Sequence, residues 1–487
     1  MKNLAILLVL SLATLFDASA KQLSIGRIDD TTINPSEIDA TVTRLMHGAE
    51  IPGLGLTVFN HGQIAYQKAY GLRNKEKSLP MTPDTVLNAA SLTKAAFAYM
   101  VMQLVDEHRL DLDVPVYKYL PKPLTDYHQY SDLAGDPRYQ QITARMLLDH
   151  SSGFPNFRWF NSDRKLNINF TPGSKFAYSG EGMELLQLVV ETITGKPLGE
   201  LMQTRVFQPL GMTRTSMTWQ PQFDGDFANG YDEYGRWLGA PKFTRPDAAG
   251  SMSTTLADYT RLLQAVMAGR GISGKSRREM FTPQIEINSL HEFPTLAPET
   301  TDANKSIRLS YGLGWGLYFT PYGEAFFKEG HSDGFRNYTV CFLKSGIGLL
   351  IMTNSANGEG IYKELLETLL KNTFTPIDWE GFTPYDQLPA RPPLKQPIEV
   401  QVAPEKLDRY VGRYRVSADL VLVIVRQGNH LIIKEGSEDH EMIPESENHF
   451  FSNTADDKIA FPIGADGRVK EMVFQTGGTT TSFKKME

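Results

Sequence analysis

The hydrophobic pattern at the start of the chain changes from a helical period to an alternating one. Apolar residues recur at helical spacing over 38–46, directly after Pro35-Ser36, which predicts a helix. The stretch LGLTVFNHGQIAYQKAYG, residues 54–71, has two apolar runs on either side of Asn60-His61-Gly62 and predicts a β-hairpin. Residues 89–105 are apolar on nearly every side, so we expect a helix that is buried inside a large domain.

The rest of the first 375 residues alternates between helical and strand-like segments. Helical spacing predicts further helices at 142–150, 181–194 and 255–268, and the segment IYKELLETLLKNTF at 361–374 closes the region as another helix. Strand-like runs occupy 309–318, 325–328, 336–342 and 346–353. This order predicts an α+β fold, in which early and late strands form one antiparallel sheet flanked by helices and the middle forms an all-helical lobe.

The character of the sequence changes after residue 375. Seven prolines between positions 376 and 404 mark a linker. Short strand-like runs with Gly-containing turns follow at 420–425, 430–435, 457–463 and 471–476. We therefore expect a first domain at 21–375, a Pro-rich linker at 376–404 and a small all-β barrel at 405–487.

The first twenty residues are typical of a secretory signal peptide. Lys2 supplies the positive start, an apolar run covers 4–16, and Ala18-Ser19-Ala20 fits the small-x-small cleavage rule. The run is short for a membrane span, although a retained anchor is the alternative. No cysteine follows it, which excludes a lipid-anchored cysteine. We expect an exported protein, periplasmic or extracellular, with no stable membrane span after cleavage.

Composition and charge narrow the function. The 487 residues are 41% hydrophobic and 22% charged, with a formal net charge of -7, which argues against nucleic acid as a partner. Cys341 is the only cysteine and lies in the strand-like run NYTVCF, where we expect it to be a buried apolar residue. We find no HExxH motif and no convincing spacing of metal ligands, so we expect no metal and no cofactor.

Two motif matches compete with the chemistry developed below. GRGISGKS, residues 269–276, fits the phosphate-loop pattern, but a helical run precedes it where that loop needs a strand, so a solvated turn is the better interpretation. GHSDG, residues 330–334, fits the nucleophile elbow with Ser332 as nucleophile. The elbow needs a helix after the serine, whereas the run FRNYTVCF predicts a strand.

The pattern Ser-x-x-Lys occurs three times, and its context selects one of them. The three pairs are Ser91/Lys94, Ser162/Lys165 and Ser482/Lys485. Only SLTK at 91–94 begins a buried apolar helix, where residues three apart share a face and Lys94 lies over Ser91. A serine hydroxyl attacks a carbonyl only when a base takes its proton, and lysine is a base near pH 7 only when its pKa falls by about 3 units.

Burial among neighbouring alanines and the helix N-terminus both lower the pKa of Lys94, but neither is secure alone. A second basic or polarising group should therefore converge on the pair. The backbone N–H of Ser91 at the helix start would face a developing oxyanion. The alternative is structural: Ser91 caps the helix and Lys94 extends to the surface.

Two downstream segments change this balance. TPGSKFAYSGEGMELLQLVVE, from Thr171, carries Tyr178 at a loop-to-helix junction, and EGHSDGFRNYTVCF, from Glu329, begins a strand. With SLTK they resemble, in order, the three motifs of the serine β-lactamase and penicillin-binding-protein superfamily, in its class C, esterase and D-aminopeptidase branch. The resemblance covers roughly residues 30–375. The C-terminal module, from LDRYVGRYRV, resembles the lipocalin-like barrels appended to some members.

The resemblance implies roles for individual residues. Ser91 would be the acylated nucleophile, Lys94 its proton acceptor, and Tyr178 a second base, as a phenolate or a proton relay. His331 would take the place of the lysine in the family's K-T-G motif, and the backbone N–H of Gly334 would be the second oxyanion donor.

The chain departs from the family at two positions. Gly180 replaces the asparagine of Y-x-N, and Asp333 replaces the last glycine of H-x-G, where it would crowd the substrate or receive a substrate amine. Both departures put efficient β-lactam hydrolysis in doubt. His150 is expected to have a supporting or capping role.

We therefore expect an exported serine hydrolase that works through an acyl-enzyme on Ser91. The reaction would be hydrolysis of an ester, or of an amide next to a small or D-amino acid, as in D-aminopeptidases, carboxypeptidases and esterases. The alternatives are a catalytically weak penicillin-binding-like sensor protein and a β-lactamase. The partner would be a small-molecule or peptide substrate, for which cell-wall fragments are candidates, and the oligomeric state stays open.

Overall fold

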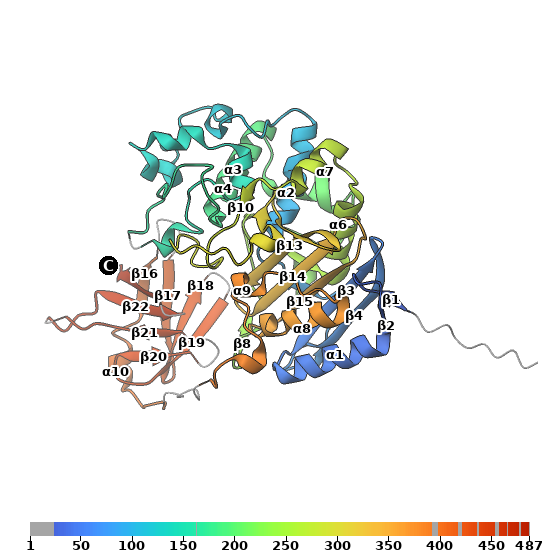
Figure 1. The fold of residues 1–487 in the computed structure, drawn as a ribbon. Coiled ribbons are helices and arrows are strands. Elements are labelled where there is room, and N and C mark those ends of the chain that lie inside the picture. Colours follow the sequence, from blue (N-terminus) through green and yellow to red (C-terminus); the bar gives the residue numbers. More distant parts are fainter. Residues whose placement is uncertain are drawn as a thin grey trace, which may run out of the picture.

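The structure is a computed structural model that describes residues 24–161, 163–391, 398–416, 421–435, 438–452, 457–464, 466–476 and 479–486. The expected signal peptide at 1–20 lies outside these residues. Figure 1 shows a large domain built on one sheet with helices around it, and a barrel at its side. None of the helices in these ranges is long and apolar enough to cross a membrane.

A nine-stranded sheet forms the centre of the first domain. Its order is β10-β11-β12-β13-β14-β15-β3-β4-β5, and neighbouring strands run antiparallel. The early strand β3 pairs with the late strand β15, with Leu54 opposite Thr353, as the strand order predicts. The strands are β3 (Gly53–Asn60), β4 (Gln63–Asn74), β5 (Leu79–Pro80), β10 (Ile285–Glu286), β11 (Ser310–Tyr311), β12 (Gly316–Thr320), β13 (Gly323–Ser332), β14 (Phe335–Phe342) and β15 (Gly348–Thr353).

Helices cover both faces of this sheet, and a separate hydrophobic core lies under each. One core contains the buried side of α1 (Pro35–Gly48) together with α8 (Tyr362–Leu365) and the turn of π-helix at Leu366–Leu370. Asn34 and Glu37 form a reciprocal capping box that fixes the start of α1. The other core is built around α2 (Leu92–Asp106), which is buried on nearly every side as its composition predicts, and α6 (Leu256–Ala268).

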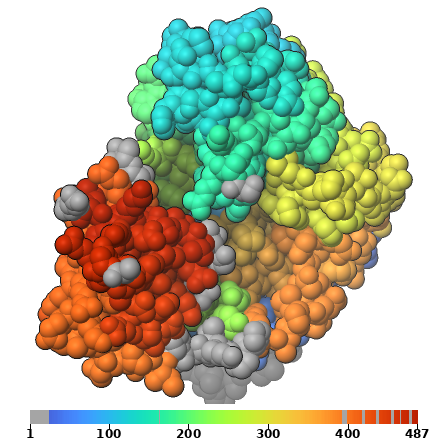
Figure 2. Space-filling view, turned by 90° about the vertical axis from the view of Figure 1, so that its left-hand side faces the viewer, coloured from blue at the N-terminus to red at the C-terminus, as the bar shows by residue number. Residues whose placement is uncertain are grey.

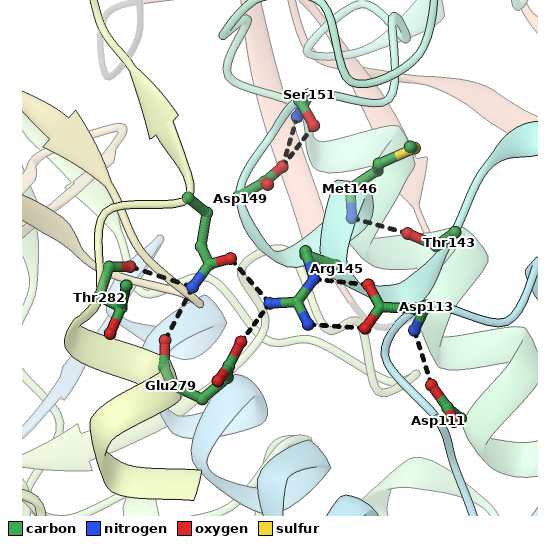
Figure 3. Close-up of polar contacts among 10 residues, drawn as sticks. Asp111, Asp113, Thr143, Arg145, Met146, Asp149, Ser151, Glu279 and Thr282 are labelled. Atoms are coloured by element: carbon green, nitrogen blue, oxygen red, sulfur yellow. Dashed lines mark hydrogen bonds and ion pairs between the residues drawn. The ribbon is translucent and has the colours of Figure 1, made fainter. Parts of the chain in front are cut away.

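The helical lobe between β5 and β10 packs on α2. It contains α3 (Ala144–Leu148), α4 (Gly180–Thr194) and α5 (Leu198–Met202), with several short 3₁₀ turns, and α7 (Gly274–Phe281) follows α6. The guanidinium of Arg145 joins two of these parts (Figure 3). It donates to both carboxylate oxygens of Asp113, at 2.7 and 2.8 Å, and to Glu279 on α7 and Gln284, at 2.5 and 2.7 Å.

The structure places the start of the expected linker inside the first domain. α9 (Ile377–Glu380) follows Pro376, and the side chain of Trp379 is buried in the core under α1 and α8. The chain separates from this core only later. The prolines therefore mark an irregular segment, but the indole of Trp379 keeps its first part packed on the sheet.

The C-terminal module is a closed eight-stranded barrel, as the sequence predicts. Its strands follow chain order from β16 to β23, and β16 closes the barrel by pairing with β23. Figure 2 shows the barrel and the blue-green helical lobe on the same face of the molecule. The strands are β16 (Gly412–Arg415), β17 (Val421–Gln427), β18 (His430–Glu435), β19 (Glu438–Pro444), β20 (His449–Phe451), β21 (Lys458–Ala460), β22 (Glu471–Thr476) and β23 (Thr479–Lys485).

Candidate active site

The candidate nucleophile follows a strained turn. Strand β6 (Val86–Asn88) leads into α2 through Ala90, whose φ of 47° lies in the left-handed region that L-residues rarely adopt. The side-chain oxygen of Asn88 accepts the backbone N–H of Ala90 at 2.8 Å and the hydroxyl of Ser332 at 3.0 Å. These bonds hold the turn in the conformation that presents Ser91 at the start of α2.

Ser91 stands at the helix start without capping the helix with its side chain. The structural alternative for this serine therefore does not apply. The backbone N–H groups of Ala90, Leu92 and Thr93 are taken by acceptors of the same turn, but no acceptor within the ranges given above takes that of Ser91. A free N–H at a helix N-terminus is a suitable donor for an oxyanion that develops beside Ser91.

Lys94 lies directly over the serine and is buried. Its Nζ is 3.0 Å from Ser91 Oγ and donates to the carbonyl of Ala249 at 2.6 Å. Burial, followed by the charge of Lys328, lowers the pKa of Lys94 from 10.5 to about 7, while Asp247 works in the opposite direction. The lysine therefore does not extend to the surface, and a large fraction of it is uncharged near neutral pH.

Tyr178 lies at the end of a loop, two residues before α4 begins, and its ring is fully buried. Its hydroxyl is hydrogen-bonded to Ser91 and accepts the Nζ of Lys328 at 3.0 Å. The Nζ of Lys94 lies 4.9 Å from the centre of its ring. Burial raises the pKa of Tyr178 well above 10, so the group that meets the serine is a neutral phenol. That state suits a proton relay and not a phenolate base.

His150 supports the tyrosine from behind. Its imidazole is fully buried, 4.4 Å from the ring of Tyr178 between centroids, and its Nδ1 accepts the backbone N–H of Ser179 at 3.2 Å. Asp149, the preceding residue, accepts both the N–H and the hydroxyl of Ser151, which fixes the turn that carries the histidine (Figure 3). Burial lowers the pKa of His150 well below 6.5, so it stays neutral.

The lysine that contacts Tyr178 was not predicted. The family motif predicts His331 at this place, but His331 is half exposed and its Nδ1 lies 2.5 Å from the carboxylate of Glu359. Lys328 of β13 is fully buried, donates to the Tyr178 hydroxyl and forms an ion pair with Glu329. The spacing Lys-x-Gly exists in the sequence three residues before His331, and that signal identifies the buried lysine.

Gly330 shows why a glycine must stand two residues after this lysine. A β-carbon at Gly330 would lie 2.5 Å from the carbonyl oxygen of Ala89 and 3.2 Å from the backbone nitrogen of Leu92. Only glycine lets β13 lie directly against the start of α2. Among the described residues, β12 pairs with β13 no further than Phe327, so the edge of β13 beyond it is open beside the nucleophile.

The structure places Asp333 and Gly334 in the turn between β13 and β14. Ser332 pairs with Phe335, so these two residues form the whole connection, and Gly334 has a φ of 69°. A β-carbon there would lie 2.6 Å from the backbone nitrogen of Tyr231 in β7 (Gly230–Tyr231). The turn begins three residues after Gly330, about 10 Å along an extended strand. Gly334 thus packs on β7, and the open edge of β13 is nearer to Ser91.

The space beside Gly180 is filled by an aromatic ring. Gly180 is the first residue of α4, and its N–H donates to the carbonyl of Asn156 at 2.9 Å. A β-carbon at this position would lie 2.5 Å from the ring of Phe157, which is stacked on Trp159 at 4.2 Å. The ring occupies the volume where the family's asparagine would begin, so the departure at Gly180 is built into the packing.

The competing motifs have structural roles. Ser332 ends strand β13 and is followed by strand β14 and not by a helix, so the geometry of a nucleophile elbow is absent at this serine. The phosphate-loop match follows helix α6, with Gly269 as its left-handed C-cap. No group of three or more potential metal ligands occurs in the part of the chain that the structure describes. Cys341 is buried in β14, as expected.

A serine at a helix start, a buried lysine one turn on and a buried tyrosine, set between a sheet and a helical lobe, define the class of the serine hydrolases that use Ser-x-x-Lys. Residues 38–370 match the model of the family described as Beta-lactamase, and the chain belongs to that family. It is a serine hydrolase of this fold. Residues 396–486 match a further family, described as Domain of unknown function (DUF3471), which coincides with the barrel.

Relatives and solved structures share the whole length of the chain or its first domain. Penicillin-binding protein 4* of Bacillus subtilis (strain 168) is 23% identical, over 85% of this chain and 91% of its own. Esterase EstB of Burkholderia gladioli is 30% identical over 36% of this chain and 50% of its own. The octameric penicillin-binding protein homologue from Pyrococcus abyssi superposes with a TM-score of 0.57 at 20% identity, covering 93% of this chain and all of that one. Likeness at this level shows the fold.

Proposed function

We propose that this chain hydrolyses esters, or amides next to a small or D-amino acid, through an acyl-enzyme on Ser91. The observation that carries the proposal is the buried amine of Lys94, 3.0 Å from Ser91 Oγ, with its pKa lowered to about 7. An amine in that state accepts the hydroxyl proton near neutral pH. The hydroxyl of Tyr178 contacts the same serine and supplies the second group that the chemistry needs.

In the acylation step, the proton of the Ser91 hydroxyl passes to Lys94 Nζ as Oγ bonds to the substrate carbonyl carbon. The carbonyl oxygen gains the electron pair and faces the free backbone N–H of Ser91 and the open edge of β13. The tetrahedral intermediate then collapses: the bond from the carbonyl carbon to the leaving oxygen or nitrogen breaks. The leaving group takes the proton from Lys94, either directly or through the neutral phenol of Tyr178.

Water completes the cycle in the reverse sense. It attacks the acyl carbon, gives one proton to Lys94, and the ester bond to Oγ breaks as that proton returns to Ser91. The reaction requires no cofactor. The names of the relatives, a penicillin-binding protein and an esterase, support a peptide or ester substrate, and cell-wall-derived peptides are the peptide candidates.

Location is part of the proposal. The charged start, apolar run and Ala18-Ser19-Ala20 of the first twenty residues support export to the periplasm or the exterior. Small molecules or peptides would be the partners there.

A binding protein that keeps the fold without turnover is the second candidate, because the ring of Phe157 excludes a side chain at Gly180. A p-nitrophenyl ester and a fluorescent penicillin, each followed by mass spectrometry of the acylated peptide, separate the candidates. Ester turnover that Ser91→Ala abolishes supports the hydrolase. A stable penicillin adduct without turnover supports the binding protein, and rapid release of opened penicillin supports a β-lactamase. Turnover that survives Ser91→Ala contradicts the proposed mechanism.

A further inference from the structure

The positive charge nearest to the reacting groups is already neutralised by the chain itself. Lys328 is fully buried, and its ammonium group is shared between the Tyr178 hydroxyl and the carboxylate of Glu329. Glu329 is also buried, with 7% of its side chain exposed, so solvent does not screen the pair. A substrate carboxylate that approached Lys328 would have to compete with a carboxylate that is already in contact.

A second buried acid reinforces this arrangement. Glu292 is 2% exposed, and neither of its carboxylate oxygens has a hydrogen-bond partner among the residues described. Burial, followed by the charge of Glu329, raises the pKa of Glu292 well above 4.5, while Lys328 and Lys94 act in the opposite direction. The next residue, Phe293, packs its ring 5.6 Å from that of Tyr178, which places this segment at the active site.

The other cations near the end of β13 are also paired. His331 and Arg336 both face the carboxylate of Glu359, at 2.5 and 2.9 Å. On the opposite side, Lys94 lies within the field of Asp247 and Glu184 as well as Glu329. Of the side chains that the structure describes around Ser91, none offers a cation without a carboxylate beside it.

The rim of the site is aromatic. Phe293, 46% exposed, packs on Tyr178, and Trp159, 57% exposed, stacks on Phe157 beside Gly180. Such surfaces contact apolar groups of a substrate more favourably than charged ones.

We propose that Glu329 is a specificity-determining residue, which makes this site reject acyl groups that carry a carboxylate and accept uncharged, apolar ones. The inference rests on the proposed function, because it names the class of acyl donor for the Ser91 reaction. Glu329 acts by pairing with Lys328. Without Glu329, the ammonium group would be free to attract a substrate carboxylate.

A matched pair of substrates tests the proposal. p-Nitrophenyl butyrate and mono-p-nitrophenyl succinate release the same leaving group and differ chiefly in a methyl group against a carboxylate. We expect the wild type to prefer the butyrate by at least about thirtyfold in kcat/KM. Glu329→Gln keeps the shape of the side chain and removes its charge, and should reduce this preference by at least about tenfold. Adding Lys328→Met to Glu329→Gln should cancel that change.

Glu324→Gln is the matched control, because Glu324 is an exposed acid on the same strand. It should leave the preference unchanged. Equal kcat/KM values of the wild type for the two esters would overturn the inference without any variant. So would an unchanged preference in a Glu329→Gln protein that melts at a temperature close to that of the wild type. Failure of the proposed function itself is distinct: neither ester would be hydrolysed, or hydrolysis would survive Ser91→Ala.

Discussion

The pKa of Lys94 should respond in opposite directions to the removal of two charges of opposite sign. Lys328→Met removes the cation that lowers this pKa most after burial, and Asp247→Asn removes the acid that most counteracts it. We expect the acid limb of the pH profile of kcat/KM to lie near pH 7 in the wild type. It should move to higher pH in Lys328→Met and to lower pH in Asp247→Asn.

The structure gives the size of the first shift. The Nζ atoms of Lys94 and Lys328 lie 4.9 and 4.6 Å from the centre of the Tyr178 ring, so they are at most about 9.5 Å apart. With an effective dielectric constant of about 20, two unit charges at that distance interact by about 1.7 kcal/mol, which corresponds to slightly more than one pKa unit. A pKa near 8 would leave about a tenth of Lys94 uncharged at pH 7, compared with about half in the wild type.

The assay is initial-rate hydrolysis of a neutral p-nitrophenyl ester from pH 5.5 to 9.5 at constant ionic strength. Lys328→Met should therefore lose about fivefold in kcat/KM at pH 7 and recover this part of the loss by pH 9. A loss that is the same at every pH would instead reflect the missing bond to the Tyr178 hydroxyl. Acid limbs that move in the same direction in the two variants, or in neither, would refute the assignment of Lys94 as the base.

Three further predictions concern stability. Burial lowers the pKa of Lys94 to about 7 from 10.5, so the unfolded state binds more protons between these values and the folded state is penalised most below pH 7. Lys94→Met should therefore raise the free energy of unfolding by about 1–3 kcal/mol at pH 6, less at pH 10, in denaturant titrations. Gly180→Asn should cost about 1–3 kcal/mol through its clash with Phe157, and Phe157→Ala should relieve much of that cost in the double variant, in contrast to additive behaviour. Arg145→Met should lower the melting temperature by several degrees, because it leaves Glu279 and Asp113 without their partner, and an unchanged value would contradict the network in Figure 3.

The sequence was sufficient for the nucleophile and its partner. Ser91 and Lys94 begin a helix whose apolar composition predicts complete burial, and burial is also what lowers the pKa of Lys94. The antiparallel pairing of an early hairpin with late strands follows from the order of the elements and is confirmed by the contact between β3 and β15. These features depend on local periodicity and on chain order, both of which are visible in a single sequence.

The buried lysine of β13 escaped because two signals overlap within six residues. Lys328-Glu329-Gly330 and His331-Ser332-Asp333 both offer a basic residue at the start of a short motif. The choice depends on which glycine must approach the start of α2, and this is a tertiary contact: the β-carbon that Gly330 lacks would meet Ala89. The barrel strands β19, β20 and β23 were not predicted, because charged and polar residues on the outer face obscure their alternation.

The same charges that set the pKa of the base also set the charge of the substrate. A fully exposed field from Lys328 would lower the pKa of Lys94 further, but it would also draw any anion to the reacting carbonyl. Glu329 reduces both effects, because its carboxylate lies against Lys328 and is also one of the acids that raise the pKa of Lys94. Glu329→Gln should therefore change two observables together: a lower acid limb for the neutral ester and a weaker preference against the succinate. A change in the preference without a change in the acid limb would show that Glu329 acts by contacting the substrate and not through the charge of Lys328.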